Sequence, residues 1–188
     1  MDSRTQIVCL HEGKKGKSID PIFIRVLLKK LNPAWINPWQ GNNVILAKDY
    51  GGRTSLIAAV PGELKRCLSF GGHTTLLVWA DVDDDMAGCE ELKNAFWKVA
   101  QQEGVSRADF DQVVFVFAKD RLENWIEFLR TGATDETKEG PRLKHDREVA
   151  DAARSLADRC LRGAPIPNIP PSLEWSCSNW RALVNRMR

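Results

Sequence analysis

The sequence predicts an α/β fold in which a mostly parallel, Rossmann-like sheet is flanked by helices and followed by a helical C-terminal extension. Short apolar runs rich in β-forming residues alternate with helical patterns over residues 1–130, as in chains that build a sheet through right-handed crossovers. Two of the runs, TTLLVWA at 74–80 and VVFVFA at 113–118, are almost continuously apolar. Strands buried on both faces of a parallel sheet have this character.

The predicted strands are Ile7–Leu10, Val44–Ala47, Thr75–Ala80 and Val113–Phe117. Each is a short apolar run of the length that strands usually have. Because sites in open α/β sheets form at the carboxyl ends of the strands, the residues that directly follow these runs are the first candidates for function.

The predicted helices between the strands are Pro21–Leu31, Thr54–Phe70, Met86–Glu103 and Asp120–Arg130. We expect Asp20 to be the N-cap of the first, with Pro21 at its first position. The second helix should be interrupted or kinked near Pro61. Asp120 and Glu123 have the spacing of a capping box at the start of the fourth.

The C-terminal third has a different composition, so we divide the chain into an α/β domain, 1–130, and an extension, 131–188. The extension begins with a polar segment, 131–143, which we expect to be a mobile loop. A helix at 144–161, a proline-rich connector at 163–172 and a short amphipathic helix at 178–187 follow. The sequence leaves open whether this extension packs on the sheet domain or on a partner.

The composition is that of an ordinary globular protein, with 43% hydrophobic and 28% charged residues among 188. A net charge of +2 gives no strong overall field, so binding to nucleic acid would need a local basic patch. The five cysteines are dispersed and odd in number, which favours reduced thiols in the cytoplasm. No apolar run approaches the length of a membrane span, so we expect no membrane association.

The stretch after the first strand allows two interpretations. Gly16, Lys17 and Ser18 match the second half of a phosphate-binding loop, and Asp81 could follow a Walker B strand. However, His11 stands where the first glycine of that loop is required. The helix also begins too late, near Asp20, for its N-terminal amides to face the phosphates. A P-loop NTPase is therefore the less favoured alternative.

The other interpretation is a metal site formed by carboxylates at the ends of two strands. Glu12 follows the first strand, and Asp81, Asp83 and Asp85 follow or lie near the end of the third. Strand ends in a parallel sheet meet at one rim, and a divalent cation with a preference for oxygen ligands, Mg²⁺ or Mn²⁺, relieves the repulsion among packed carboxylates. The alternative explanation of part of this cluster is that Asp84 and Asp85 stabilise the start of the next helix.

These motifs resemble the TOPRIM domain, as found in small stand-alone TOPRIM proteins and OLD-family nucleases. The resemblance covers residues 5–130 and rests on HEG at 11–13, ADVDDD at 80–85 and KDRLENWIEFL at 119–129. It implies that Glu12 is the general acid/base or a metal ligand and that Asp81 and Asp83 hold Mg²⁺. Relatives often have a second acidic residue after the first strand. The only candidate in this sequence is Asp20, which we interpret as a helix cap.

Several basic residues lie at or near the same rim and are candidate contacts to a nucleic-acid backbone: Lys14, Lys15, Lys17, Arg53, Lys119 and Arg121. The resemblance makes Glu123 an outer metal ligand or a residue that orients Lys119 or Arg121. Simpler alternatives remain, namely a solvated lysine loop and a glycine turn before Arg53 with Thr54 as N-cap.

The resemblance therefore implies a cytoplasmic Mg²⁺- or Mn²⁺-dependent nuclease, with DNA favoured over RNA as the substrate. Stand-alone relatives suggest a nuclease subunit that works with an ATPase partner, in defence against phage. The main alternative is a non-catalytic binding module, in which the acidic rim is structural and the C-terminal extension recruits a partner.

Overall fold

The described part of the chain forms a four-stranded parallel sheet with the strand order β2-β1-β3-β4. The computed structural model describes residues 6–13, 18–31, 45–70, 74–143, 145–162 and 165–186. The strands are β1 (Gln6–His11), β2 (Ile45–Asp49), β3 (Thr74–Val82) and β4 (Val114–Lys119). The predicted α/β class and the parallel, Rossmann-like arrangement of the sheet are thus confirmed.

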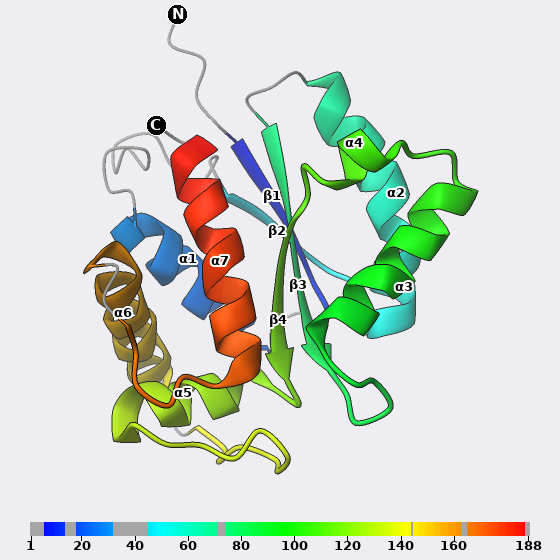
Figure 1. Cartoon of the computed structure of the whole chain (residues 1–188). Helices are drawn as coiled ribbons and strands as arrows, with labels where there is room; N and C mark the ends of the chain where they lie inside the picture. The colour runs from blue at the N-terminus through cyan, green and yellow to red at the C-terminus, as the bar shows by residue number, and fades with distance from the viewer. Residues whose placement is uncertain are drawn as a thin grey trace, which may run out of the picture.

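Helices cover both faces of this sheet (Figure 1). One face carries α2 (Arg53–Ser69), α3 (Cys89–Gln102) and the short α4 (Arg107–Phe110). The other carries α1 (Asp20–Leu31), α5 (Leu122–Thr131), α6 (Asp146–Arg162) and most of α7 (Pro171–Arg186). The carboxyl ends of the strands lie together at the lower rim in Figure 1.

The burial of strand β3 on both faces of the sheet explains why its sequence is apolar throughout. Leu77 and Trp79 point into the core beside α1, whereas Leu76, Val78 and Ala80 point into the core beside α2 and α3. Successive side chains of a strand alternate between the two faces of the sheet. Because helices cover both faces, neither set can be polar, and the alternation seen in half-exposed strands is absent from β3.

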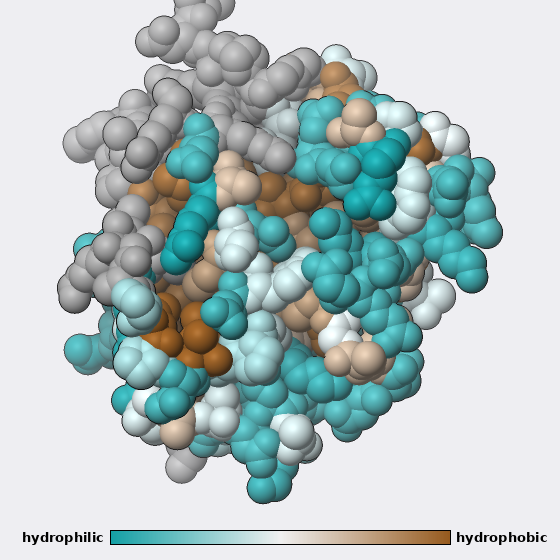
Figure 2. Space-filling view, in the orientation of Figure 1, coloured by the Kyte–Doolittle hydropathy of each residue, from teal (hydrophilic) through white to brown (hydrophobic). Residues whose placement is uncertain are grey.

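The C-terminal extension packs on the sheet, which answers the question that the sequence left open. Helix α6 lies against α1 and α5, and Val149, Ala153 and Leu156 are buried there. Helix α7 begins at Pro171, earlier than predicted, and runs along the edge strand β4. Figure 2 shows mostly hydrophilic residues over α3 and the lower rim of this face, with hydrophobic patches between the C-terminal helices.

Side chains of helix α7 also form hydrogen bonds with the backbone groups at the edge of the sheet. The hydroxyl of Ser176 accepts a hydrogen bond from the Phe117 backbone N–H at 3.0 Å and donates to the Phe117 carbonyl at 3.1 Å. The side-chain amide of Asn179 donates to the carbonyl of Phe115 at 2.7 Å. An exposed edge strand offers unpaired backbone groups to other chains, and these side chains occupy them.

Predictions about the starts of α2, α3 and α5 are wrong. Asp120 and Glu123 form no capping box, because the N-cap of α5 is Arg121, without a side-chain cap among the described residues. Asp120 instead lies at φ 62°, and its N–H extends the sheet by donating to the carbonyl of Val82. Helix α2 has Gly52 rather than Thr54 as its N-cap and runs through Pro61 without interruption. Helix α3 begins at Cys89, after a turn, rather than at residue 86.

Residues 132–143, which follow α5, have no regular secondary structure but are held by specific contacts. The side-chain amide of Asn124 donates to the carbonyl of Lys138 at 3.1 Å. The carboxylate of Glu136 accepts hydrogen bonds from the N–H and the hydroxyl of Ser172, at the start of α7. These contacts place the segment beside the carboxyl rim of the sheet.

A search of the described helices for a segment long and apolar enough to cross a membrane finds none.

Candidate active site

A cleft of about 410 Å³ opens at the carboxyl rim, between the ends of β1 and β3 and the starts of α1 and α5. The glycine turn after β2 closes one side. Side chains that can carry negative charge dominate its lining: Glu12, Asp20, Asp81, Asp83, Asp120 and Glu123. The rim position is the one expected for sites in open α/β sheets.

Glu12 and Asp81 meet as predicted, because β1 and β3 are neighbours in the sheet. The carboxylate of Glu12 accepts a hydrogen bond from the backbone N–H of Asp81 at 3.2 Å. Burial raises the pKa of Glu12, and the Asp81 hydrogen bond only partly offsets this. The structure therefore holds the Glu12 carboxyl directly beside the first aspartate of the DxD sequence.

Asp81 is the most confined acid of the cleft. Its Oδ1 is enclosed and has no hydrogen-bond partner among the described residues. Burial, followed by the charges of Asp20, Glu12 and Glu123, raises the pKa of Asp81 well above its usual range. A buried carboxylate without a counter-charge is costly, so the site either binds a proton or a cation at this oxygen.

Asp20 also faces the cleft, and its interpretation as a helix cap is wrong. Ser18 takes the capping role: its hydroxyl accepts from the Asp20 N–H at 3.1 Å and donates to Asp20 Oδ2 at 2.6 Å. The pKa of Asp20 is raised to about 6: burial is the largest cause, the hydrogen bond from Ser18 lowers it, and the charges of Glu123 and Glu12 raise it. Asp20 is therefore the second acidic residue that the chain contributes after β1.

Gly13 allows this arrangement by its small size. A Cβ atom at this position would lie 2.3 Å from the Cβ of Ser18 and 3.2 Å from Asp20 Oδ2. The Ser18–Asp20 pair thus packs directly on the backbone of the HEG sequence. The sequence signal for Asp20 was present in this glycine and in Ser18, a good capping residue two positions earlier.

Arg53 binds two of the predicted metal ligands. Its Nη1 lies 3.0 Å from Asp83 Oδ2, and its Nη2 lies 2.6 Å from Asp85 Oδ2. Asp83 still lines the cleft, but Asp85 does not, and the Asp85 hydrogen bond to Arg53 lowers its pKa. In this structure the guanidinium that we predicted to contact phosphate is the counter-charge of Asp83 and Asp85.

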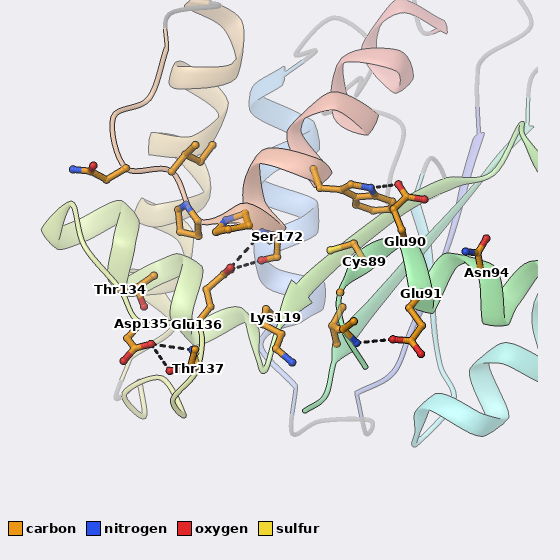
Figure 3. Close-up of a pocket in the computed structure, with 18 residues that line it drawn as sticks. Cys89, Glu90, Glu91, Asn94, Lys119, Thr134, Asp135, Glu136, Thr137 and Ser172 are labelled. Atoms are coloured by element: carbon orange, nitrogen blue, oxygen red, sulfur yellow. Dashed lines mark hydrogen bonds between the residues drawn. The ribbon is translucent and has the colours of Figure 1, made fainter. Parts of the chain in front are cut away.

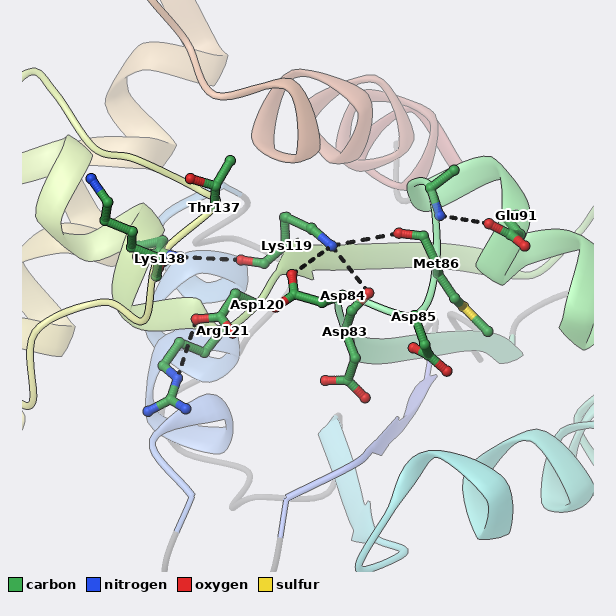
Figure 4. Close-up of polar contacts among 12 residues, drawn as sticks. Asp83, Asp84, Asp85, Met86, Glu91, Lys119, Asp120, Arg121, Thr137 and Lys138 are labelled. Atoms are coloured by element: carbon green, nitrogen blue, oxygen red, sulfur yellow. Dashed lines mark hydrogen bonds and ion pairs between the residues drawn. The ribbon is translucent and has the colours of Figure 1, made fainter.

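Lys119 and Arg121 are likewise engaged within the protein. Lys119 Nζ lies 3.3 Å from Asp84 Oδ1 and donates to the carbonyls of Asp83 at 3.0 Å and Met86 at 3.5 Å (Figure 4). It therefore holds the turn after β3 in shape. Arg121 pairs with Asp120 at 3.6 Å and with Glu139. Glu123 lines the cleft near Asp20 and Asp81, whose pKa values it raises.

The predicted lysine loop, with Lys14, Lys15 and Lys17, lies outside the described residues.

The oxygen atoms that line the cleft are of the kind that a hard divalent cation prefers, but their arrangement is not that of a metal site. Its oxygens come from Glu12, Asp20, Asp81 and Asp83, and Mg²⁺ and Mn²⁺ prefer such ligands. The unpartnered Oδ1 of Asp81 is aimed at no internal donor of the described chain. Within the described ranges, however, no three His, Cys, Asp or Glu side chains are arranged as a metal-ligand group. Asp83, one of the predicted ligands, is paired with Arg53.

Comparisons with protein-family models, with curated proteins and with solved structures each found no match to this chain.

Proposed function

We propose that the chain is a TOPRIM-type nuclease that cleaves a nucleic-acid phosphodiester with Mg²⁺ or Mn²⁺. The observation that carries the proposal is that Glu12, Asp20 and Asp81, from two strand ends and a helix start, line one cleft in which Oδ1 of Asp81 has no hydrogen-bond partner among the described residues. Mutually repelling acids cost folding free energy. Their retention in a cleft at the sheet rim is accounted for by a bound cation.

Asp81, Glu12 and Asp83 would hold the ion, and Asp20 with Glu123 would bind a second ion or orient the first. A bound divalent cation supplies positive charge at a phosphate oxygen and activates a water molecule. The number of ions follows from whether Asp20 ligates directly, which its position opposite Asp81 permits.

The protein's own groups support the proton transfers of hydrolysis. A carboxyl with a pKa of about 6, as burial gives Asp20, exchanges its proton close to neutral pH. Burial also raises the pKa of Glu12. Its carboxylate accepts a hydrogen bond from the Asp81 N–H and can accept a proton from water on the cleft side. Arg53, 19% exposed in its side chain, neutralises Asp83 and Asp85 until another cation takes that role.

The resemblance adds the remaining parts of the proposal: DNA rather than RNA as substrate, an ATPase partner and a role in defence against phage. A non-catalytic binding module is the second candidate, favoured by the pairing of Arg53 with two of the acids. The phosphate-loop alternative is disfavoured by Ser18, whose hydroxyl is bound to Asp20 instead of facing a nucleotide.

The test is cleavage of supercoiled plasmid and of single-stranded DNA by the purified chain with Mn²⁺ or Mg²⁺ and no nucleotide. We expect Asp81→Asn to lose at least 100-fold in rate, on the scale of removing a metal-ligating group. Asp111→Asn, an equal charge change in an exposed ion pair with Arg107 after α4, should cleave like the wild type. Equal rates for the two variants would assign the activity to a contaminant and reject the proposal.

A further inference from the structure

A second, larger cavity lies at the carboxyl ends of β3 and β4, where Val82 and Lys119 line it (Figure 3). It measures about 1050 Å³ and is bounded by the start of α3, the segment Thr134–Thr137 and the segment Asn168–Trp175. We call it the α3–α7 pocket. The volume is at the upper end of the range for small-molecule sites, about 300–1,000 Å³.

One wall of the α3–α7 pocket is apolar. Ile169 and Pro170 precede α7, and Pro171 is the first residue of the helix. Trp175 follows on the first turns of the helix and stacks on Phe117, with ring centroids 5.2 Å apart and an angle of 9° between planes. Grooves lined by aromatic side chains bind extended peptides in several recognition domains.

Three acids that line the pocket are held in place by hydrogen bonds and form no ion pair within the described chain. Glu90 accepts a hydrogen bond from the Trp175 indole, Glu91 from the Ala87 N–H, and Glu136 from Ser172. These donors are all uncharged. No lysine or arginine of the described chain forms an ion pair with any of the three acids, as the thirteen ion pairs between described residues involve other groups.

The cations near the pocket are already paired. Lys119 forms an ion pair with Asp84 at 3.3 Å, and Lys138 forms one with Asp135 at 2.8 Å. The negative field reaches the floor of the pocket, because the charge of Glu136, after burial, is the next largest cause of a rise in the pKa of Cys89 to about 12. A phosphate group would be repelled here, whereas a guanidinium or ammonium group would be attracted.

We propose that the α3–α7 pocket binds an extended segment of a protein partner in which an arginine or lysine lies beside an apolar residue. The cationic group would lie beside the carboxylate of Glu90 or Glu91, with Glu136 adding to the negative field of the pocket, and the apolar side chain would pack beside Trp175 and the prolines. This inference goes beyond the proposed nuclease, since it uses none of the cleft acids and holds whether or not the chain cleaves nucleic acid.

The experiment starts from a random twelve-residue peptide library displayed on phage and selected on the full-length chain. We expect the selected peptides to carry Arg or Lys next to Leu, Ile, Val or an aromatic residue. The tightest peptide is then labelled, and its Kd is measured by fluorescence anisotropy. Replacing its arginine by citrulline, which keeps the shape without the charge, should raise the Kd at least tenfold.

Matched variants locate the site. Glu90→Gln/Glu91→Gln keeps the hydrogen-bond acceptors, removes two charges, and should raise the Kd at least tenfold. Glu103→Gln/Asp111→Asn removes two exposed charges beyond the far end of α3 and should leave the Kd within twofold of the wild-type value. Asp81→Asn, in the cleft, should also leave it unchanged. Melting curves verify that each variant is folded.

The proposal is overturned if selection yields no binder, if the binders lack basic residues, or if the Glu90→Gln/Glu91→Gln protein binds as tightly as the control variant. It is also overturned if a twelve-nucleotide single strand competes with the peptide in the Asp81→Asn protein, since the pocket would then belong to a nucleic-acid path.

Discussion

The side chain of Glu12 is joined to the backbone of Asp81 by a hydrogen bond of 3.2 Å, which links the carboxyl ends of β1 and β3. The two acids are therefore a fixed pair rather than two independent surface groups. Asp20 approaches the same pair from the start of α1. The consequences of this arrangement can be measured in the metal-free protein and in the presence of ions.

The first prediction concerns stabilisation by metal. Mn²⁺ at about 100 times its Kd should raise the melting temperature by about 5 to 10 °C, because binding at that excess contributes about 2.7 kcal/mol to a chain of this size. Asp81→Asn should lose this response and, without metal, should melt higher than the wild type, since it removes a buried charge beside two acids. Differential scanning calorimetry measures both effects. An equal metal response in the wild type and Asp81→Asn would contradict the site.

The second prediction concerns pH. The folded-state pKa of Asp20, about 6, lies above its usual 3.8, so the folded chain binds more protons between these values. The free energy of unfolding of the metal-free protein should therefore fall as pH rises from about 4 to 6, by on the order of 2 to 3 kcal/mol for this group. Asp20→Asn should flatten the profile. Urea unfolding at several pH values measures it.

The difference between the two profiles reports Asp20 together with its effect on Asp81, whose pKa the charge of Asp20 raises. His11 acts in the opposite direction in both proteins: burial lowers its pKa, and acid therefore favours the unfolded chain. The metal response of the wild type should also grow as pH rises through 6, since ligating carboxylates must be deprotonated. Parallel profiles for the wild type and Asp20→Asn would show that Asp20 is solvated.

The third prediction tests the packing of Asp20 on the HEG sequence. Gly13→Ala should displace Ser18 and with it Asp20, because the new Cβ would lie 2.3 Å from the Ser18 Cβ. We expect a loss of about 1 to 3 kcal/mol, as for other overpacked sites, and a weaker Mn²⁺ response. Gly62→Ala is the control: it lies inside α2, and no described atom is within 4 Å of its Cβ position. This variant should gain about 0.5 to 1 kcal/mol.

The fourth prediction concerns the protected edge of the sheet. Ser176→Ala leaves the Phe117 N–H and carbonyl without partners and should cost about 1 to 3 kcal/mol. Ser178→Ala, on the same helix but exposed, should change stability by less than about 0.5 kcal/mol. Hydrogen exchange of the Phe117 amide should accelerate in the first variant only. If both variants unfold alike, the hydroxyl of Ser176 does not stabilise the edge of β4.

The fifth prediction concerns the lysine loop. If Lys14, Lys15 and Lys17 contact phosphates, replacing all three by alanine should flatten the log–log salt dependence of DNA binding by about two units. The Mn²⁺ melting response should persist, because the cleft acids remain. The control removes Lys29, Lys93 and Lys98, which lie on helices α1 and α3. A salt slope that changes equally in both proteins would reflect net charge rather than contacts of the loop.

The sequence alone determined the parallel sheet and the meeting of Glu12 with Asp81. Strands buried on both faces must be apolar at every position, so TTLLVWA and VVFVFA identified β3 and β4 without reference to the rest of the chain. The residues that follow such strands have little choice of location, because parallel strand ends share one rim. The position of these two acids is therefore a consequence of chain order.

Only the tertiary structure decided what the neighbouring polar residues do. Asp20 and Asp120 both stand where local preference favours a helix cap, but a cap is worth only about 1 kcal/mol and packing can replace it. Ser18 caps in place of Asp20, which the close approach to Gly13 turns into the cleft. Arg53 reaches across the rim to Asp83 and Asp85, a contact between distant segments that no local pattern encodes.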